Sequence, residues 1–320
     1  MSVLEGVTNA LLIHSPRKNG FAEKEAKEIN LFLPRLCEEH GISLKYQQIG
    51  LPSVENGYEE AFDSNDAVIV FSYKLPFSRL TKRKKNVLFT ERFLINQMAG
   101  YFVDSRGLFS DSNLAVEART DKELINMDVG KLAMEWFGWE GGSGGNPNGP
   151  LLVCLQVNGD RSVSKPYFPL RGQASDTREV LLGMLRKHLP RGVRVVVRTH
   201  PKDKSAFRHN WEVNDSRVPL RDVLPQCRAM VTISSTCASE AALLGLPVAT
   251  FGTGPYTNHD ITLDCSTDPS MVGNLLEWKP DYYKCERYVR TVFTNHFLSF
   301  DRPESYPCTE LFRWIKSVHT

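Results

Sequence analysis

The chain has 320 residues, of which 41% are hydrophobic, 10% aromatic and 24% charged. This composition excludes a disordered chain, a collagen-like repeat and a disulfide-stabilised miniprotein, and the length is sufficient for two domains. The 39 Lys and Arg residues against 37 Asp and Glu leave a net charge of +2, so the protein lacks the global positive field of a histone-like protein.

Cysteine usage and the lengths of the apolar runs indicate the compartment. The seven cysteines are scattered and odd in number, which is typical of reduced thiols in a cytosol. The longest apolar runs, at 66–71 and 151–155, are far shorter than the ~20 residues that cross a bilayer. Glu5 precedes the first apolar stretch, which we interpret as a strand and not as a signal peptide. We therefore expect a cytoplasmic protein without a transmembrane span.

Short apolar runs alternate with segments of helical period, which predicts a largely parallel α/β sheet. In the first part of the chain we expect strands at 10–14, 42–46, 66–72 and 86–91, and helices at 22–39 and 121–139. Residues 140–150 contain five glycines and two prolines and offer nothing to bury, so they are predicted to be a linker.

The same alternation resumes after this glycine-rich stretch. We expect strands at 151–157, 193–199, 229–233 and 247–251, and helices at 176–189, 220–227, 239–244 and 282–297. The prediction is two Rossmann-like α/β domains facing a cleft, where such folds bind ligands. Their expected bounds are 1–140 for the first domain, 141–150 for the linker, 151–277 for the second domain and 278–320 for a helical segment packing across the hinge.

The second domain contains the most informative motif. His200 follows the strand at 193–199, at the strand end where ligands bind in parallel α/β sheets. Ser234, Ser235 and Thr236 follow the next predicted strand and precede a helix, whose N-terminal amides are suited to a phosphate. Glu240, in the first turn of that helix, is placed to accept hydrogen bonds from ribose hydroxyls. Together these residues predict a nucleotide-sugar pocket that uses neither a cofactor nor a metal.

Each of these residues has a simpler interpretation when taken alone. Ser and Thr before a helix commonly serve as N-caps, and a histidine at a strand end is often a loop residue. The combined order of strand, His-Pro, helix, strand, Ser/Thr turn, Glu and Gly-Leu-Pro-Val favours the pocket. The first domain is therefore expected to be the acceptor side and the second to hold the nucleotide sugar.

A basic segment provides the candidate acceptor site. It contains Arg79, Lys82 and Arg83 and has five cations in the seven residues 79–85. Such a run is commonly a solvated loop. At the mouth of a first-domain strand it would attract an anionic acceptor, whether a phosphoglycolipid, an acidic glycan or a DNA backbone.

The chain resembles the bacterial capsule polysaccharide synthesis proteins that include the β-Kdo transferases. The resembling segments are 152–160, 196–203 and 232–248, followed by Phe251-Gly252 and Tyr256, with a weaker match at Glu91 and 101–107. The resemblance implies a two-domain GT-B fold and CMP-Kdo as the donor. The chain departs from the family at Ala238-Ser239, where Gly-Phe is usual, and at Arg198-Thr199, where Lys-Pro is usual.

The resemblance also implies roles for individual residues. His200 and the Ser234/Ser235 turn would bind the nucleotide phosphate and Glu240 the ribose, while Asp160 would attack the anomeric carbon in a retaining double displacement. Transfer through an oxocarbenium-like transition state needs such a carboxylate and an acid or base opposite it. Glu91, with Asp104 behind it, is our candidate for the second role. The alternatives are a turn residue for Asp160 and an ion-paired strand end for Glu91.

Four hypotheses follow from these patterns. The leading one is a metal-independent glycosyltransferase that acts on an anionic glycan or glycolipid, with peripheral contact at the inner face of the membrane. The second is a virus-encoded glycosyltransferase for modified bases in DNA, whose contact with DNA would involve the basic segment 79–85. The third is a noncatalytic nucleotide-sugar-binding protein, and the fourth is a nucleotide-sugar epimerase.

Overall fold

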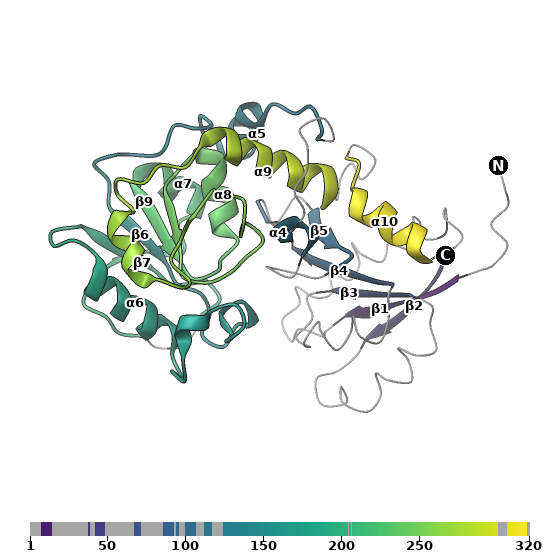
Figure 1. The fold of residues 1–320 in the computed structure, drawn as a ribbon, viewed down its shortest axis with the longest axis horizontal. Coiled ribbons are helices and arrows are strands. Elements are labelled where there is room, and N and C mark those ends of the chain that lie inside the picture. The colour runs from purple at the N-terminus through teal and green to yellow at the C-terminus, as the bar shows by residue number, and fades with distance from the viewer. Residues whose placement is uncertain are drawn as a thin grey trace. The chain divides into compact units, whose positions relative to one another are not determined.

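The computed structural model describes residues 8–14, 38, 42–48, 67–71, 86–92, 94–95, 100–106, 112–116, 124–203, 205, 207–299 and 306–318. The chain divides into two compact units. The first unit comprises 1–93, 97–108 and 293–320, and the second comprises 94–96 and 109–292. Both are α/β units (Figure 1), so the predicted fold class is confirmed.

A mixed sheet forms the first unit. Among the described residues its strands are β1 (Thr8–His14), β2 (Ile42–Gln48), β3 (Ala67–Phe71), β4 (Val87–Arg92), β5 (Gly100–Asp104) and β12 (Phe297–Ser299). They lie in the order β12-β5-β4-β3-β1-β2. The first four strands are parallel, whereas β5 is antiparallel to both β4 and β12. Gly100 permits the pairing of β5 with β12, because a Cβ at this position would collide with the Leu298 carbonyl.

Helix α10 (Thr309–Val318) covers this sheet. Its Leu311, Trp314 and Ile315 are buried in one cluster with Ile69 of β3 and Leu88 of β4. The apolar residues of α10 recur at helical spacing, so a single face of the helix supplies this contact. The C-terminal residues of the chain therefore complete the core of a unit that begins at the N-terminus.

The second unit contains a sheet in which every described pairing is parallel. Its strands are β6 (Leu151–Cys154), β7 (Val195–Arg198), β8 (Glu212–Asn214), β9 (Ala229–Thr232), β10 (Val248–Thr250) and β11 (Leu263–Asp264). Their order, β11-β10-β9-β6-β7-β8, is that of a dinucleotide-binding Rossmann sheet read from its sixth strand to its third. The chain direction across the sheet reverses between β6 and β9, and this switch point is where such folds bind ligands.

Helices follow the strands between residues 109 and 295. They are α4 (Asn113–Val116), α5 (Val129–Phe137), α6 (Thr177–His188), α7 (Leu220–Val223), α8 (Cys237–Leu244) and α9 (Tyr282–Asn295), with the short turns η4 (Arg161–Val163), η5 (Pro169–Arg171), η6 (Leu224–Gln226) and η7 (Pro269–Asn274). Figure 1 shows α6 and α8 on opposite sides of the sheet. Opposite placement follows from right-handed crossovers that run in opposite directions from the switch point.

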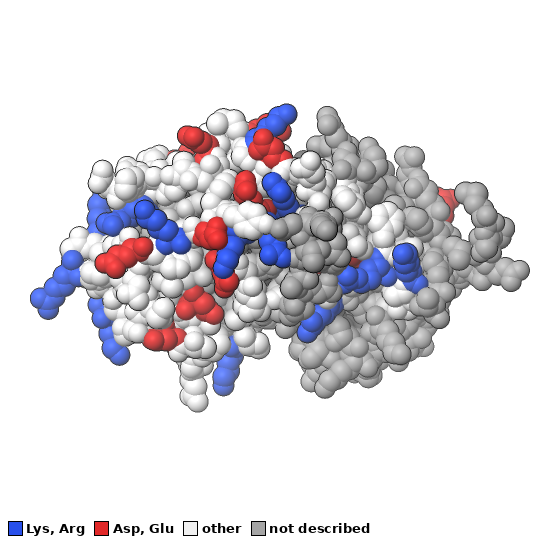
Figure 2. Space-filling view, turned by 45° about the horizontal axis from the view of Figure 1, so that its top comes forward, with Lys and Arg blue, Asp and Glu red and all other residues white. Residues whose placement is uncertain are grey.

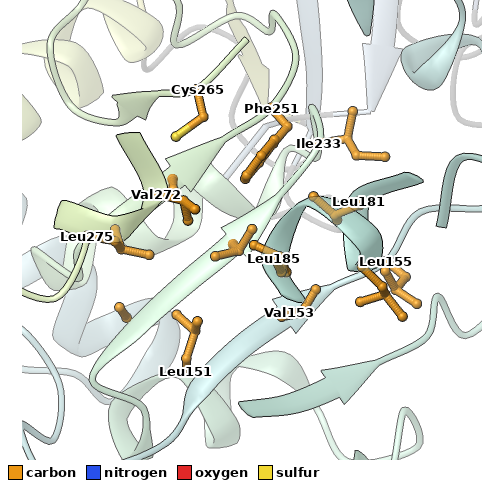
Figure 3. Close-up of a cluster of buried hydrophobic side chains, with 14 of the residues drawn as sticks. Leu151, Val153, Leu155, Leu181, Leu185, Ile233, Phe251, Cys265, Val272 and Leu275 are labelled. Carbon is orange, nitrogen blue, oxygen red and sulfur yellow. The ribbon is translucent and has the colours of Figure 1, made fainter. Parts of the chain in front are cut away.

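The core of the second unit lies between the sheet and α6. Leu181 and Leu185 of α6 are fully buried and belong to one cluster with Val153 of β6, Phe251 and Leu275 (Figure 3). All four residues of β6 are buried, as expected for a central parallel strand covered on both faces. This packing fixes the carboxyl ends of the strands, where the candidate site lies.

The glycine-rich stretch 140–150 was predicted to be a linker between domains, but it lies within the second unit. The Gly142 and Gly144 amides donate to the carbonyls of Leu243 and Leu244 at the end of α8. A Cβ on Gly145 would collide with the Cys227 carbonyl and lie 2.7 Å from Leu246 Cδ1. Glycine serves here for close packing, whereas the composition alone indicated flexibility.

The unit boundaries therefore lie elsewhere than predicted. The chain passes between the units near residues 93–97, at 108–109 and at 292–293, the last within α9. The predicted helix at 121–139 begins only at Val129, after the N-cap Asp128, whose side chain accepts from the Lys131 amide. The predicted helix at 22–39 lies outside the described residues except for Glu38, which is helical.

Candidate functional site

The predicted site residues of the second unit follow three neighbouring strands. Strand β6 pairs with both β7 and β9, and all three run parallel. Asp160 follows β6, His200 follows β7, and the turn 234–236 follows β9. Because the carboxyl ends of parallel strands meet at one edge of a sheet, the structure gathers these candidates at the switch point.

His200 is half-buried, and a backbone contact sets its tautomer. Its Nδ1 accepts a hydrogen bond from the Lys202 amide at 3.0 Å. In the neutral ring the proton is therefore on Nε2, which is left as a donor. Burial lowers the pKa of His200, and the Lys202 and Arg198 charges lower it further, whereas Asp160 and Asp203 act in the opposite direction. His200 is thus a neutral hydrogen-bond donor at neutral pH.

Asp160 is exposed and begins the turn η4. Its Oδ1 accepts from both the amide and the hydroxyl of Ser162, each at 2.9 Å. One carboxylate oxygen of Asp160 therefore stabilises the turn, as the alternative interpretation expected. In the described part of the chain, Oδ2 has no hydrogen-bond partner.

Ser234 is fully buried and connects two strand ends. Its amide donates to Gln156 Oε1 at 2.8 Å and its hydroxyl donates to the Ser162 carbonyl. Gln156 Nε2 in turn donates to Ser162 Oγ at 2.6 Å. These three residues form a buried hydrogen-bonded cluster at the switch point, so the Ser234 hydroxyl is engaged within the protein. The partly exposed residues of the turn are Ser235 and Thr236.

Ser235 and Thr236 are half-buried at the start of α8. Ser235 Oγ accepts from the Cys237 amide at 3.3 Å, which satisfies one helix amide. Thr236 occupies the N-cap position without a side-chain capping bond. Its hydroxyl has no partner among the described residues and is available beside the positive end of the helix dipole.

Glu240 projects from the first turn of α8. Burial raises the pKa of its carboxyl well above the usual range, and the nearby Cys237 sulfur adds to this shift. No donor among the described side chains or amides reaches this carboxyl, although buried polar groups are normally hydrogen-bonded. Glu240 is thus a half-buried carboxyl that can accept hydrogen bonds from a bound molecule.

The two carboxylates predicted in the first unit differ in environment. Asp104 is fully buried; its Oδ1 accepts from the Arg106 amide at 2.8 Å, and its Oδ2 lies 3.3 Å from His296 Nδ1. These contacts give Asp104 a structural role at the end of β5. Glu91 is half-buried on β4, opposite Phe102 of β5. Of the two, Glu91 has the more accessible side chain.

The remaining site predictions concern charge and metal. Arg79, Lys82 and Arg83 lie outside the described residues. Within the described ranges, no group of three or more His, Cys, Asp or Glu side chains is placed to hold a metal ion. No described helix has the length and apolar character needed to cross a membrane. Figure 2 shows Lys and Arg interspersed with Asp and Glu on the visible face of the second unit.

Three residues of the site have contacts that the sequence pattern did not predict. Gln156 and Ser162 belong to the buried cluster described above, and Arg178 is buried at the start of α6. A polar residue directly after a buried strand was the only signal for Gln156. Asp176 signals a helix N-cap, but the tertiary contacts of Arg178 involve residues 25 and 27 positions later in the chain.

The fold and the polar residues at the carboxyl ends of the strands define the class of protein. Two Rossmann-like α/β units, one with the 3-2-1-4-5-6 strand order and polar side chains at its switch point, constitute an architecture of the GT-B type. More particularly, residues 146–275 match the family model described as "Capsule polysaccharide biosynthesis protein". The resemblance to capsule polysaccharide synthesis proteins is thereby confirmed over this segment.

The chain is also similar to solved structures. The β-Kdo 2,4 transferase KpsC of Thermosulfurimonas dismutans is 17% identical, with 99% of each chain covered and a TM-score of 0.53. The β-Kdo 2,7 transferase KpsC of the same organism is 16% identical, with 80% of this chain and 83% of that chain covered and a TM-score of 0.49. A Methanocaldococcus jannaschii UDP-GlcNAc 2-epimerase in complex with UDP-GlcNAc and UDP is 11% identical, with 89% and 99% covered and a TM-score of 0.35. No curated protein sequence matches the chain.

Proposed function

We propose that the protein is a glycosyltransferase that moves a sugar, Kdo from CMP-Kdo, to an anionic glycan or glycolipid. The observation that carries this proposal is the set of unsatisfied polar groups at one sheet edge: the His200 Nε2–H donor, the Thr236 hydroxyl and the Glu240 carboxyl. They follow strands on both sides of the switch point, and the match of 146–275 to a capsule synthesis family supports the same class.

The charges and hydrogen-bonding groups suit a nucleotide donor. In the proposed complex, the His200 Nε2–H and the Thr236 hydroxyl donate to the phosphate, next to the amides at the start of α8. Glu240 accepts from the ribose hydroxyls, which would satisfy its carboxyl. All of these groups are supplied by protein side chains and amides, so the proposed donor site uses no cofactor and no metal.

Asp160 is the proposed nucleophile. Its Oδ1 is held by Ser162, so the carboxylate has a fixed orientation while Oδ2 is available. In the first step an Asp160 oxygen bonds to the anomeric carbon as the bond to the phosphate oxygen breaks, and the nucleotide leaves with that electron pair. In the second step an acceptor hydroxyl displaces Asp160 and its proton passes to a base, for which Glu91 is the candidate.

The acceptor assignment rests on the sequence. Arg79, Lys82 and Arg83 would attract an acidic glycan or the headgroup of a glycolipid. A glycolipid acceptor would bring the protein to the cytoplasmic face of the membrane, and we propose this peripheral location. Duplex DNA is the competing polyanion, and its binding would fall steeply as salt is added.

Thermal stabilisation by nucleotides tests the donor site. A selective ligand raises the melting temperature by mass action, by the equivalent of about 2.7 kcal/mol at 100 times its Kd. We expect CMP to shift the melting temperature of the wild type, and His200→Ala to reduce the shift. His209→Ala is the matched control, because His209 Nδ1 also accepts a backbone amide two residues later, that of Trp211. A shift by UDP alone would overturn the CMP assignment.

Product formation tests the reaction. CMP-Kdo is supplied with an anionic glycolipid acceptor, and transfer is followed as labelled product together with released CMP. We expect Asp160→Asn to abolish transfer while CMP binding remains, and the exposed Asp222→Asn to be fully active. Full activity of Asp160→Asn would refute the double displacement. Binding of CMP with no transfer to any acceptor would favour a noncatalytic binding protein.

A further inference from the structure

Arg178, in the first turn of α6, is buried even though it is charged. Its Nε and Nη2 donate to the two carboxylate oxygens of Asp176 at 2.9 and 2.6 Å. Its Nη1 donates to Asp203 Oδ2 at 2.8 Å and to Ser205 Oγ at 2.7 Å. The Phe207 ring lies 4.4 Å from the guanidinium carbon. Every nitrogen of the guanidinium is thus engaged, and all of these contacts are with the cap of α6 or with residues that follow β7.

The stability of the fold does not by itself explain such a cluster. Removing a guanidinium and two carboxylates from water is costly, and buried ion pairs contribute little net stability compared with apolar residues of similar volume. They do restrict geometry, because a planar guanidinium holding a carboxylate by two bonds leaves few alternative arrangements. The Arg178 guanidinium also lowers the pKa of Asp176, so that carboxyl stays ionised at neutral pH. The cluster is therefore suited to fixing the positions of Asp203, Ser205 and Phe207.

The segment 200–203 is a single hydrogen-bonded turn. The Asp203 amide donates to the His200 carbonyl at 2.9 Å, and the Lys202 amide donates to His200 Nδ1 at 3.0 Å. The Asp203 side chain is 5% exposed and carries the bond to Arg178. A displacement of Asp203 would therefore shift both the backbone of His200 and the contact that sets its tautomer.

We propose that Arg178 is a positioning residue for the donor site: through Asp203 it holds His200 with its Nε2–H directed at the donor phosphate. This inference rests on the proposed function for the ligand, but the coupling between Arg178 and His200 is independent of any ligand. It adds to the site a residue on α6 that does not touch the nucleotide. Contacts from the N-terminus of α6 thus hold the residues that follow the carboxyl end of β7.

Two variants test the coupling. Arg178→Gln removes the positive charge, and Asp203→Asn removes the negative charge that faces Nη1 while leaving the Arg178–Asp176 pair intact. In Arg178→Gln we expect His200 to become exposed, so that its pKa in an NMR titration rises toward the ordinary value of about 6.5. The Asp203 carboxylate itself raises the pKa of His200, so Asp203→Asn is compared with the wild type by CMP affinity. The His200 signal is assigned as the one missing from His200→Asn. The control is Arg194→Gln, which breaks the exposed Arg194–Glu212 pair between the ends of β7 and β8.

The second readout is CMP affinity in the intact protein. We expect Kd for CMP to rise about tenfold in Arg178→Gln, which corresponds to about 1.4 kcal/mol, and to stay unchanged in Arg194→Gln. A folded Arg178→Gln protein with the wild-type His200 titration, or a folded Asp203→Asn protein with the wild-type Kd for CMP, would overturn the inference. Failure of the wild type to bind CMP or another nucleotide would instead refute the proposed donor site, and the His200 titration would still decide whether Arg178 positions the ring.

Discussion

The two neighbouring glycines of the stretch 140–150 provide a matched test of its packing. Gly144 and Gly145 have the same left-handed backbone, each with φ of +76°. They differ in space: the nearest atom to a Cβ on Gly144 is a carbonyl oxygen at 3.8 Å, whereas a Cβ on Gly145 would collide with the Cys227 carbonyl. Gly144→Ala and Gly145→Ala therefore have the same conformational cost, but only Gly145→Ala adds a steric cost.

The magnitudes follow from these two costs. An alanine in the left-handed region costs about 1 kcal/mol relative to glycine, and we expect this loss in Gly144→Ala. Overpacking adds about 1–3 kcal/mol, so Gly145→Ala should lose about 2–4 kcal/mol in total. Because the obstructing atom belongs to the backbone at the end of η6, a rotamer change does not relieve the collision.

Urea unfolding followed by tryptophan fluorescence measures the difference. Trp136, Trp139, Trp211 and Trp278 lie in the second unit, so the signal reports mainly on it. The free energy of unfolding is compared at matched slopes, because a changed slope would indicate a change in cooperativity. Equal losses for the two alanine variants would refute the packing argument and restore the interpretation of 140–150 as a linker.

Three further predictions concern the second unit. Tyr288→Phe should destabilise the second unit by about 1–3 kcal/mol, because the 2.7 Å hydrogen bond to the buried Ser239 hydroxyl is lost. Tyr256→Phe should leave the stability unchanged, because the buried Tyr256 hydroxyl has no partner among the described residues. Equal losses for the two variants in thermal melts would contradict this prediction. Burial raises the pKa of Glu240, so the free energy of unfolding of the wild type falls as the pH rises above the ordinary value of 4.5. In thermal melts at stepped pH, Glu240→Gln should therefore become increasingly more stable than the wild type toward neutral pH. A difference that does not change with pH would count against this prediction. Phe251→Ala should cost about 3–5 kcal/mol in urea unfolding, because the ring is fully buried in the core, and a loss below 1 kcal/mol would disagree with that packing.

The sequence predicted the central strands well, because burial on both faces leaves a continuous apolar run. The run at 151–155 and the Val-rich run at 195–198 became β6 and β7 for this reason. Strand β8 was missed because it lies at the sheet edge and its residues, Glu212 to Asn214, are largely exposed. Strand β12 was missed because Phe297 was counted with the helix before it, and its pairing with β5 joins residues about 195 positions apart.

The positions of the candidate site residues were predictable where they depend on strand ends and not where they depend on tertiary contacts. His200, Thr236 and Glu240 lie at positions that the pattern of strand, turn and helix defines. The buried role of Ser234 depends on Gln156 Oε1, which approaches it across 78 residues of sequence. No local pattern distinguishes a serine with a free hydroxyl from one whose hydroxyl is engaged within the protein.

The division of the chain has a consequence for its synthesis. The second unit is continuous from 109 to 292, whereas the first unit needs residues 293–320 to complete its sheet and core. Domains generally fold as units while the chain emerges from the ribosome. The later-synthesised second unit therefore has all of its residues before the first unit has β12 and α10. Until then, β5 is an unpaired edge of the kind that recruits foreign strands, and a chaperone that acts on this protein would be needed longest at its N-terminal half.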